Sequence, residues 1–289
     1  MHVFVVPLQA EEQAMNLKKA IVAMESAAIK AGQMLCSIQT QSKRLQSRKD
    51  FLTDADLASE RIILNALARD YPDIPVLSEE KGGEERHEGL LWIVDPIDGT
   101  VNYFLQDDHW GVSIALVENG RSVAGVVCLP ARGLMFSATK NSLATQYPVG
   151  RTEKRVRHSP LSVSGDAVLS ASQFWIGWGK EESGGADHER VYEVIKKLDR
   201  GTLYPQIRLS ATADMMAVAR GRIAGFVFPK PDPFDIAAAG LIVERAGGTV
   251  TEMDGSPWHP FSRTLVASNR HVHKELLSLL NADKKGSVS

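Results

Sequence analysis

The residues best suited to chemistry are two aspartates that end an apolar run. Asp95 and Asp98 follow residues 90–94, enclose Pro96-Ile97 and precede Gly99. Proline fixes one φ angle and glycine permits a chain reversal, so this segment is predicted to be a buried strand that ends in a tight turn. Both carboxylates and the carbonyl of Ile97 can then point the same way. Hard oxygens of this kind suit Mg²⁺ or Mn²⁺, whereas zinc favours His or Cys.

The turn between Asp95 and Asp98 also permits two alternative roles. Asp-Pro and Asp-Gly are ordinary turn formers and need no metal. A phosphatase with an aspartyl nucleophile would have one residue between its two aspartates, and two residues stand between Asp95 and Asp98. The spacing therefore favours metal ligands, provided that more carboxylates come from elsewhere. A helix beginning at Thr100 would turn its free N–H groups toward an anion held by the metals.

Three further acids stand at the ends of predicted elements. Asp56 lies where a helix starts, Glu79 follows the apolar strand 74–78, and Asp235 begins a helix over 235–246 that is rich in small residues. Each has a simpler role as a helix cap or a surface charge. They gain chemical meaning only if the fold brings them to the turn after residue 94.

The remaining pattern predicts the elements that position these acids. Apolar residues at three- and four-residue steps predict a long helix from about 11 to 41. Segments 110–118 and 122–129, joined by Asn119-Gly120, predict a hairpin, with a third strand at 134–138. No period is visible from about 139 to 156. Beyond it, strands and helices alternate to the closing helix at 280, which predicts a sheet covered by helices.

This change of pattern places a domain junction near residue 150. Residues 1–150 are expected to form an α+β half with an antiparallel sheet and most of the metal ligands. Residues 151–289 are expected to form an α/β half that supplies Asp235 and a substrate wall.

Composition narrows the classes of function. The chain has 289 residues and a net charge of 33 − 35 = −2, so no nucleic-acid partner is expected. Two cysteines, Cys36 and Cys128, fit a reducing cytosol. The first residues lack a basic signal-peptide region, and no run of about eighteen apolar residues suggests a membrane span. We therefore expect a cytoplasmic protein without a membrane segment.

Three motifs taken together resemble the inositol monophosphatase family of Mg²⁺-dependent, lithium-sensitive phosphatases. They are 92–103 (WIVDPIDGTVNY), 234–240 (FDIAAAG) and 244–248 (ERAGG). The resemblance extends over nearly the whole chain. It implies an α/β (α+β) fold, a layered αβαβα sandwich of the inositol monophosphatase/fructose-1,6-bisphosphatase type. It also implies two or three Mg²⁺ ions, with Mn²⁺ as an alternative, and usually a homodimer.

The resemblance also implies roles for particular residues. Glu79, Asp95 and the carbonyl of Ile97 would hold one metal, and Asp95, Asp98 and Asp235 a second; Glu79 could hold a third through water. Asp56 and Thr100, together with Glu79, would form the catalytic group that orients and deprotonates water. The N–H groups of Gly99 and Thr100 would bind phosphate. No histidine receives a role, and His109 is interpreted as structural.

The chain departs from the family where the substrate is expected. Leu209-Ser210-Ala211-Thr212 stands where Gly-Ser/Thr-Ala-Ala is common, and Phe228 replaces a glutamate that bonds ring hydroxyls in inositol-cleaving members. A phenylalanine cannot accept that bond, and losing a buried acceptor can change discrimination by orders of magnitude. Ser210, Ala211 and Phe228 are thus expected to form an altered substrate-binding wall.

The first hypothesis is therefore hydrolysis of a small phosphate monoester, a polyol or sugar phosphate similar to inositol monophosphate. Fructose-1,6-bisphosphatase and 3′(2′),5′-bisphosphate nucleotidase activities are alternatives with the same chemistry. Nucleotide-cleaving relatives tend to have Lys-Gly where Val101-Asn102 stands, which disfavours the second. A non-catalytic regulatory or binding role is an alternative of another class.

Overall fold

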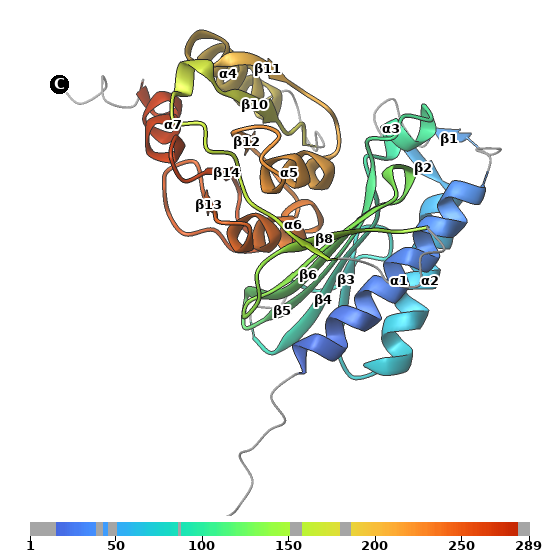
Figure 1. Ribbon diagram of the computed structural model, residues 1–289. Helices are drawn as coiled ribbons and strands as arrows, with labels where there is room; N and C mark the ends of the chain where they lie inside the picture. Colours follow the sequence, from blue (N-terminus) through green and yellow to red (C-terminus); the bar gives the residue numbers. More distant parts are fainter. Residues whose placement is uncertain are drawn as a thin grey trace, which may run out of the picture.

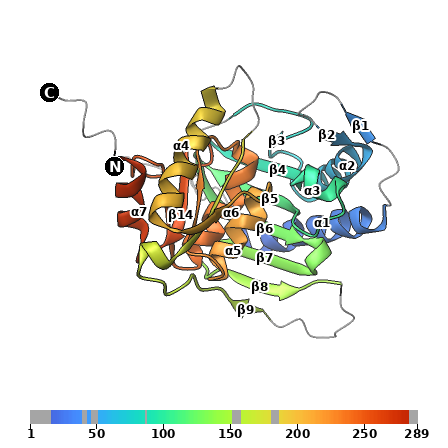
Figure 2. The same ribbon diagram turned by 90° about the horizontal axis from the view of Figure 1, so that it is seen from above.

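Most strands of the described residues form two large sheets, two short strands pair separately, and the helices lie between and around the large sheets (Figure 1, Figure 2). The computed structural model describes residues 16–38, 43–45, 51–85, 88–150, 158–179 and 186–282. Its helices are α1 (Leu17–Ser37), α2 (Asp54–Asp70), α3 (Thr100–Phe104), α4 (Ala186–Gly201), α5 (Ala211–Ala219), α6 (Pro233–Arg245) and α7 (His273–Leu280). Its strands are β1 (Lys43–Leu45), β2 (Phe51–Thr53), β3 (Val76–Ser78), β4 (Leu90–Asp98), β5 (Gly111–Glu118), β6 (Arg121–Leu129), β7 (Leu134–Thr139), β8 (Thr145–Pro148), β9 (Ser159–Pro160), β10 (Gln173–Ile176), β11 (Leu203–Gln206), β12 (Gly225–Phe228), β13 (Gly248–Thr251) and β14 (Leu265–Asn269).

The larger sheet has seven strands in the order β3-β4-β5-β6-β7-β8-β9. Strands β3 and β4 are parallel, and every later pair in this sheet is antiparallel. The predicted hairpin is confirmed as β5 and β6, and its turn residues Asn119 and Gly120 have φ angles of 50° and 73°. Because successive strands pair with their neighbours in sequence, the strong local pattern here determined the topology.

The smaller sheet has five strands in the order β11-β10-β12-β14-β13. Helices α1 and α2 cover the outer face of the larger sheet, while α4 and α7 cover the outer face of the smaller one (Figure 1). Helices α5 and α6 lie between the two sheets (Figure 2). One buried apolar cluster fills each outer interface and a third surrounds α5 and α6. This arrangement confirms the layered αβαβα fold.

Small residues let α6 approach the larger sheet closely. A Cβ atom added to Gly125 on β6 would lie 2.8 Å from the backbone oxygen of Ala238. On another side of the same helix, a Cβ atom on Gly240 would lie 2.5 Å from the ring of Trp258. The close packing fixes the start of α6, and Asp235 with it, against the sheet that carries Asp95 and Asp98.

The structure also corrects the sequence predictions. Helix α1 runs only from Leu17 to Ser37, and residues 11–15 and 39–41 of the longer predicted helix lie outside the described residues. Strand β8 lies in the stretch where the sequence shows no period. It is stabilised by pairing with β7 and not by an alternation of apolar and polar residues of its own. Strand β11 was missed altogether. The chain leaves the larger sheet after Pro160, and the division near residue 150 stays a proposal.

Two further observations concern the membrane segment and the cysteines that were considered from the composition. Among the helices of the described segments, none has the length and apolar character needed to cross a membrane. Cys36 is exposed and Cys128 is buried, and both are free thiols.

Candidate active site

Strand β4 ends in the turn that carries Asp95 and Asp98, and both carboxylates are buried, with 2% and 6% of their surface exposed. The pairing of β4 with β5 shifts register between these two residues, where Pro96 has no N–H to donate. The N–H of Ile97 donates to Asp95 Oδ1 at 3.0 Å, and Thr100 Oγ1 donates to the carbonyl of Ile97 at 3.0 Å. The turn is thus held by its own side chains.

Asp235 reaches this turn from the first turn of α6. Its Oδ2 accepts a 2.7 Å hydrogen bond from the N–H of Asp232, which precedes the helix. One carboxylate oxygen from each of Asp95, Asp98 and Asp235 lies within 4.8 Å of the others. We call these three residues the acidic triad. Asp235 therefore helps to cap helix α6, and its carboxylate also lies beside those of Asp95 and Asp98.

Burial and mutual repulsion raise the proton affinity of this triad. The pKa of Asp95 is well above its ordinary value, chiefly because the side chain is buried and then because Glu79, Asp98 and Asp235 are negative. The pKa of Asp235 is raised by burial and then by the charge of Asp98. A cation between the carboxylates would remove this cost. Three clustered carboxylate oxygens fit a divalent ion of the Mg²⁺ type, so the triad could hold a metal.

Glu79 lies beside the triad, at the carboxyl end of β3. Its N–H donates to the carbonyl of Val94 at 3.2 Å, which aligns it with Asp95 on the next strand. Among the charged neighbours of Asp95, Glu79 has the largest effect on its pKa. The fold therefore brings Glu79 to the turn.

Asp56 approaches from the first turn of α2 and is only 1% exposed. One turn later, Ser59 Oγ donates to the carbonyl of Pro96 at 2.9 Å, so the start of α2 contacts the turn that carries Asp95 and Asp98. The buried Glu60 of the same helix accepts hydrogen bonds from the Ser78 hydroxyl and from the N–H of Lys81. Helix α2 is thereby anchored both to the turn of β4 and to the end of β3.

Asp98 is held from the other half of the chain by the start of α5. Its carboxylate accepts hydrogen bonds from Ser210 Oγ at 2.5 Å, from the N–H groups of Thr212 and Ala211 at 2.8 and 3.2 Å, and from the Thr212 hydroxyl. Burial raises the pKa of Asp98, and the hydroxyl hydrogen bonds of Ser210 and Thr212 oppose this rise. Ser210 and Ala211 were expected to line a substrate wall, and the contacts that they make here position a candidate metal ligand.

Gly99 allows the chain of residues 208–210 to lie directly on the turn. It has a φ of 87°, and an added Cβ atom would lie 2.9 Å from Ser210 Cβ and 3.1 Å from the carbonyl oxygen of His109. Asn102 Nδ2 donates to the carbonyls of His109 and Arg208, both at 2.7 Å. Position 102 therefore joins the two segments that border the triad.

Phe228 occupies a different environment from the one expected for a substrate contact. It is 3% exposed, and a Cβ atom added to Gly177 would lie 2.4 Å from its ring. Its ring also packs edge-on against Phe226 at 5.7 Å. The side chain fills the core and presents almost no surface to solvent.

His109 forms a buried pair that sequence reasoning did not identify. Its Nε2 lies 2.6 Å from Asp214 Oδ1, and Arg132 lies 2.9 Å from its Nδ1. Burial lowers the pKa of His109 to about 4, so the ring is neutral at ordinary pH. The pair joins the start of β5 to α5, which agrees with a structural role for His109. Asp214 had no sequence signal beyond its place near a helix start, whereas Thr212 stands in the segment 209–212 that departs from the family pattern.

Comparisons with known proteins agree with this architecture. The profile described as "Inositol monophosphatase family" matches residues 16–285. A Thermotoga maritima protein named fructose-1,6-bisphosphatase/inositol-1-monophosphatase is 31% identical over 233 residues, which cover 81% of this chain and 83% of that protein. The Nus factor SuhB of Xylella fastidiosa is 32% identical over 276 residues, covering 91% and 94% of the two chains.

Solved structures show the same fold. The suhB protein of Bartonella henselae superposes with a TM-score of 0.79 and 28% identity, covering 93% of this chain and all 100% of the other. An IMPase of Thermotoga maritima gives a TM-score of 0.77 and 27% identity, with coverage of 93% and 98%. The resemblance of the three motifs is thus confirmed over the whole described fold, and the chain belongs to the inositol monophosphatase family.

Proposed function

We propose that this chain is a Mg²⁺-dependent phosphatase that hydrolyses a small phosphate monoester, a polyol or sugar phosphate similar to inositol monophosphate. The observation that carries the proposal is the convergence of the acidic triad, whose carboxylate oxygens lie within 4.8 Å of one another. Family membership, and a relative whose name includes two phosphatase activities, support the same chemistry. Mn²⁺ would suit the same oxygens.

The triad, Glu79 and the carbonyl oxygen of Ile97 are proposed to hold two or three ions. When bound, such ions supply positive charge beside the phosphate and lower the pKa of a coordinated water. Without a cation, the carboxylates of the triad and Glu79 would repel both a phosphate dianion and hydroxide. Loading the site is therefore expected to be a condition for substrate binding as well as for hydrolysis.

The remaining steps are assigned to groups of the chain. Thr100 donates its hydroxyl hydrogen to the carbonyl of Ile97, so its oxygen is left to accept an O–H from the attacking water. Asp56 and Glu79 are the carboxylates proposed to take up that proton. The N–H groups of Gly99 and Thr100 are proposed to bind the phosphate. Water oxygen then bonds to phosphorus while the ester P–O bond breaks, and the alkoxide leaves as the alcohol with the proton that the carboxylate had taken up.

The substrate contacts are proposed to lie around residues 209–211. Ser210 and Ala211 contribute through Asp98, which their hydroxyl and N–H groups hold. Leu209 is 42% exposed at the same place and is the better candidate for direct contact with a substrate. Phe228 can influence substrate choice only through core packing, because it is 3% exposed.

The test is phosphate release from a panel of esters with and without Mg²⁺. The panel comprises inositol monophosphate, a hexose monophosphate, fructose 1,6-bisphosphate and 3′-phosphoadenosine 5′-phosphate. Release is expected to require Mg²⁺, to be strongest with one of the first two, to fall with lithium in the low millimolar range, and to be lost in Asp95→Asn. Equal release by wild type and Asp95→Asn, with both folded by circular dichroism, would refute the mechanism.

A second candidate function comes from the relatives named Nus factor SuhB. Their name supports a regulatory role, in which a homodimer or a macromolecular partner matters more than turnover. Asp95→Asn separates the two functions, since it should abolish phosphate release and leave a regulatory role intact. Light scattering of the purified chain tests the proposed homodimer.

A further inference from the structure

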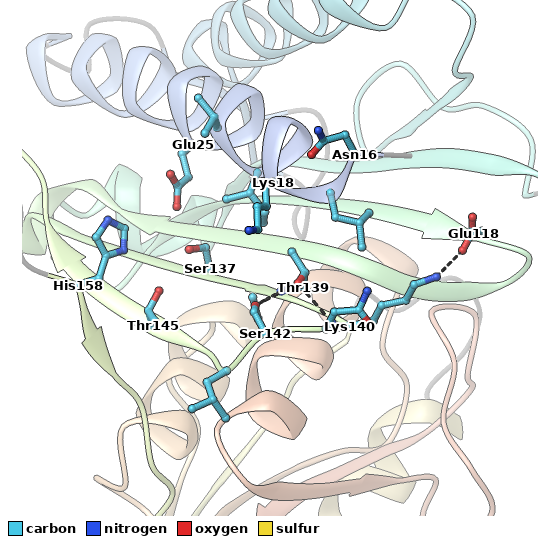
Figure 3. Close-up of a pocket in the computed structure, with 16 residues that line it drawn as sticks. Asn16, Lys18, Glu25, Glu118, Ser137, Thr139, Lys140, Ser142, Thr145 and His158 are labelled. Carbon is cyan, nitrogen blue, oxygen red and sulfur yellow. Dashed lines mark hydrogen bonds and ion pairs between the residues drawn. The ribbon is translucent and has the colours of Figure 1, made fainter. Parts of the chain in front are cut away.

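A cavity of about 720 Å³ opens between the start of α1 and the part of the larger sheet formed by β7, the β7–β8 connection and β8 (Figure 3). Asp98 pairs with Gly111 at the beginning of β5, whereas Glu118 at the end of β5 lines the cavity. At about 3.4 Å per residue, the seven steps between them span roughly 24 Å. A volume of this size is typical of sites for small organic molecules. The cavity is thus separate from the site described above.

One wall of the cavity is apolar and unusually exposed. Leu17, Ile21 and Val22 contribute from α1, and Leu143 contributes from the β7–β8 connection. Val22 and Leu143 are 65% and 66% exposed, among the most exposed large apolar side chains of the described residues. Single exposed apolar residues are ordinary, but two that line the same hollow mark a surface suited to an apolar ligand.

The floor of the cavity carries two hydroxyls without partners. Ser137 on β7 and Thr145 on β8 are directly opposite each other in the strand register. Ser137 as a whole is 6% exposed, and within the described part of the chain neither hydroxyl forms a hydrogen bond. Neither oxygen is among the fully buried, unpartnered polar atoms of the described residues, so both are open to the cavity that they line. Figure 3 shows both side chains on the sheet side of the cavity, below α1.

The charges around the cavity leave one cation available. Lys140 is paired with Glu118 at 2.7 Å, and Glu25 accepts a hydrogen bond from the Tyr147 hydroxyl. Lys18 has no carboxylate partner among the residues described, and in Figure 3 it extends from α1 toward the sheet. An anionic group between α1 and β7 would therefore find an ammonium and two hydroxyl donors.

We propose that this cavity binds a small amphipathic anion, an organic molecule with an apolar body and one carboxylate or sulfonate head. The head lies between the Lys18 ammonium and the hydroxyls of Ser137 and Thr145. The body packs on the apolar wall formed by α1 and Leu143. The proposal does not depend on the phosphatase activity, because the residues involved are separate from the triad.

The test uses anilinonaphthalene sulfonate, an aromatic sulfonate that fluoresces when it enters an apolar site, with the full-length chain. We expect saturable binding with one equivalent, and displacement by octanoate but far less by octanol, which has the same chain length and no charge. Lys18→Met keeps the apolar stem and removes the charge, and should weaken binding at least about tenfold, the equivalent of one charge-assisted hydrogen bond. Ser137→Ala should weaken it less.

Lys19→Met is the matched control, because Lys19 is the next residue on α1 and does not line the cavity. It should bind the probe like wild type. Equal binding by Lys18→Met and wild type, or equal displacement by octanol and octanoate, would overturn the proposal. Binding that falls as the protein concentration rises would also overturn it, since a second copy of the chain would then occupy the cavity. Phosphate release by Lys18→Met is expected to be unchanged.

Discussion

Replacing Thr212 by valine tests whether α5 prepares Asp98 for metal binding. Valine has nearly the same shape as threonine and removes only the hydroxyl that donates to Asp98 Oδ2. The carboxylate keeps the Ser210 hydroxyl and the N–H groups of Thr212 and Ala211. The change therefore isolates one hydrogen bond to a buried charge, with the rest of the environment in place.

The expected size of the effect follows from the kind of bond that is lost. A hydrogen bond to a charged group contributes about 1.5–3 kcal/mol, and loss of a residue that orients a metal ligand typically costs about 10- to 100-fold in metal affinity or activity. Thr212→Val should thus need about 10- to 100-fold more Mg²⁺ for half-maximal phosphate release. The hydroxyl lowers the pKa of Asp98, so its loss lets protons compete better, and the defect should grow as the pH falls.

The assay is a Mg²⁺ titration of phosphate release at neutral and at mildly acidic pH, with Mn²⁺ binding measured by calorimetry. Thr212→Ser is the matched control, because it keeps the hydroxyl and loses a methyl group. It should stay close to wild type. A valine variant with the wild-type dependence on Mg²⁺ would refute the reasoning, and so would a serine variant as impaired as the valine one, since packing would then explain both.

Two more predictions concern backbone strain and pH. Gly99→Ala should lower the free energy of unfolding by about 2–4 kcal/mol, because the left-handed backbone is strained and the new Cβ atom meets neighbours at 2.9–3.2 Å. Gly82→Ala, at a φ of 74° with no atom within reach of the new Cβ atom, should lower it by only about 1–2 kcal/mol. Chemical denaturation measures both values. Equal costs would contradict the crowding at the turn. His273 has a pKa lowered from 6.5 to about 4 by burial, so the unfolded chain takes up its proton first and stability falls as the pH drops between these values. The loss should be about 2 kcal/mol smaller in His273→Gln than in wild type, after allowance for solvent screening, because His109 keeps its own contribution in both proteins. Unfolding followed at pH values at the two ends of this range measures the difference, and an equal loss in the variant would exclude His273 as a source.

The features that could be predicted from the sequence are those with a strong local pattern. The apolar run of β4, the hairpin at Asn119-Gly120 and the small-residue face of α6 each appear where the pattern placed them. The turn at Asp95 and Asp98 is equally local, because proline and glycine specify its geometry. Strand β8 lacked such a signal, since its stability comes from pairing with β7.

The environment of the site could not be predicted, because its contacts join distant parts of the chain. Ser210 lies 112 positions after Asp98, and the sequence around it shows only a residue before a helix. The expectation that Ser210 contacts substrate rested on a family pattern, which does not say that its hydroxyl is engaged by Asp98. The sequence shows that Phe228 replaces the glutamate expected from the family pattern. It does not show that the ring is buried against Gly177, because that contact depends on how two strands pack.

These long-range contacts explain how Leu209 can stand where the family pattern has glycine. Leu209 has a φ of 58°, a conformation that suits the glycine implied here by the family resemblance and that costs a leucine about 1–2 kcal/mol. The strain is sustained because its neighbours are fixed on both sides: the Arg208 carbonyl accepts from Asn102, and Ser210 donates to Asp98. A glycine there would relax the backbone and leave Asp98 anchored. The leucine side chain, 42% exposed just before α5, therefore changes the border of the candidate site, while the hydrogen bond from Ser210 to Asp98 stays in place.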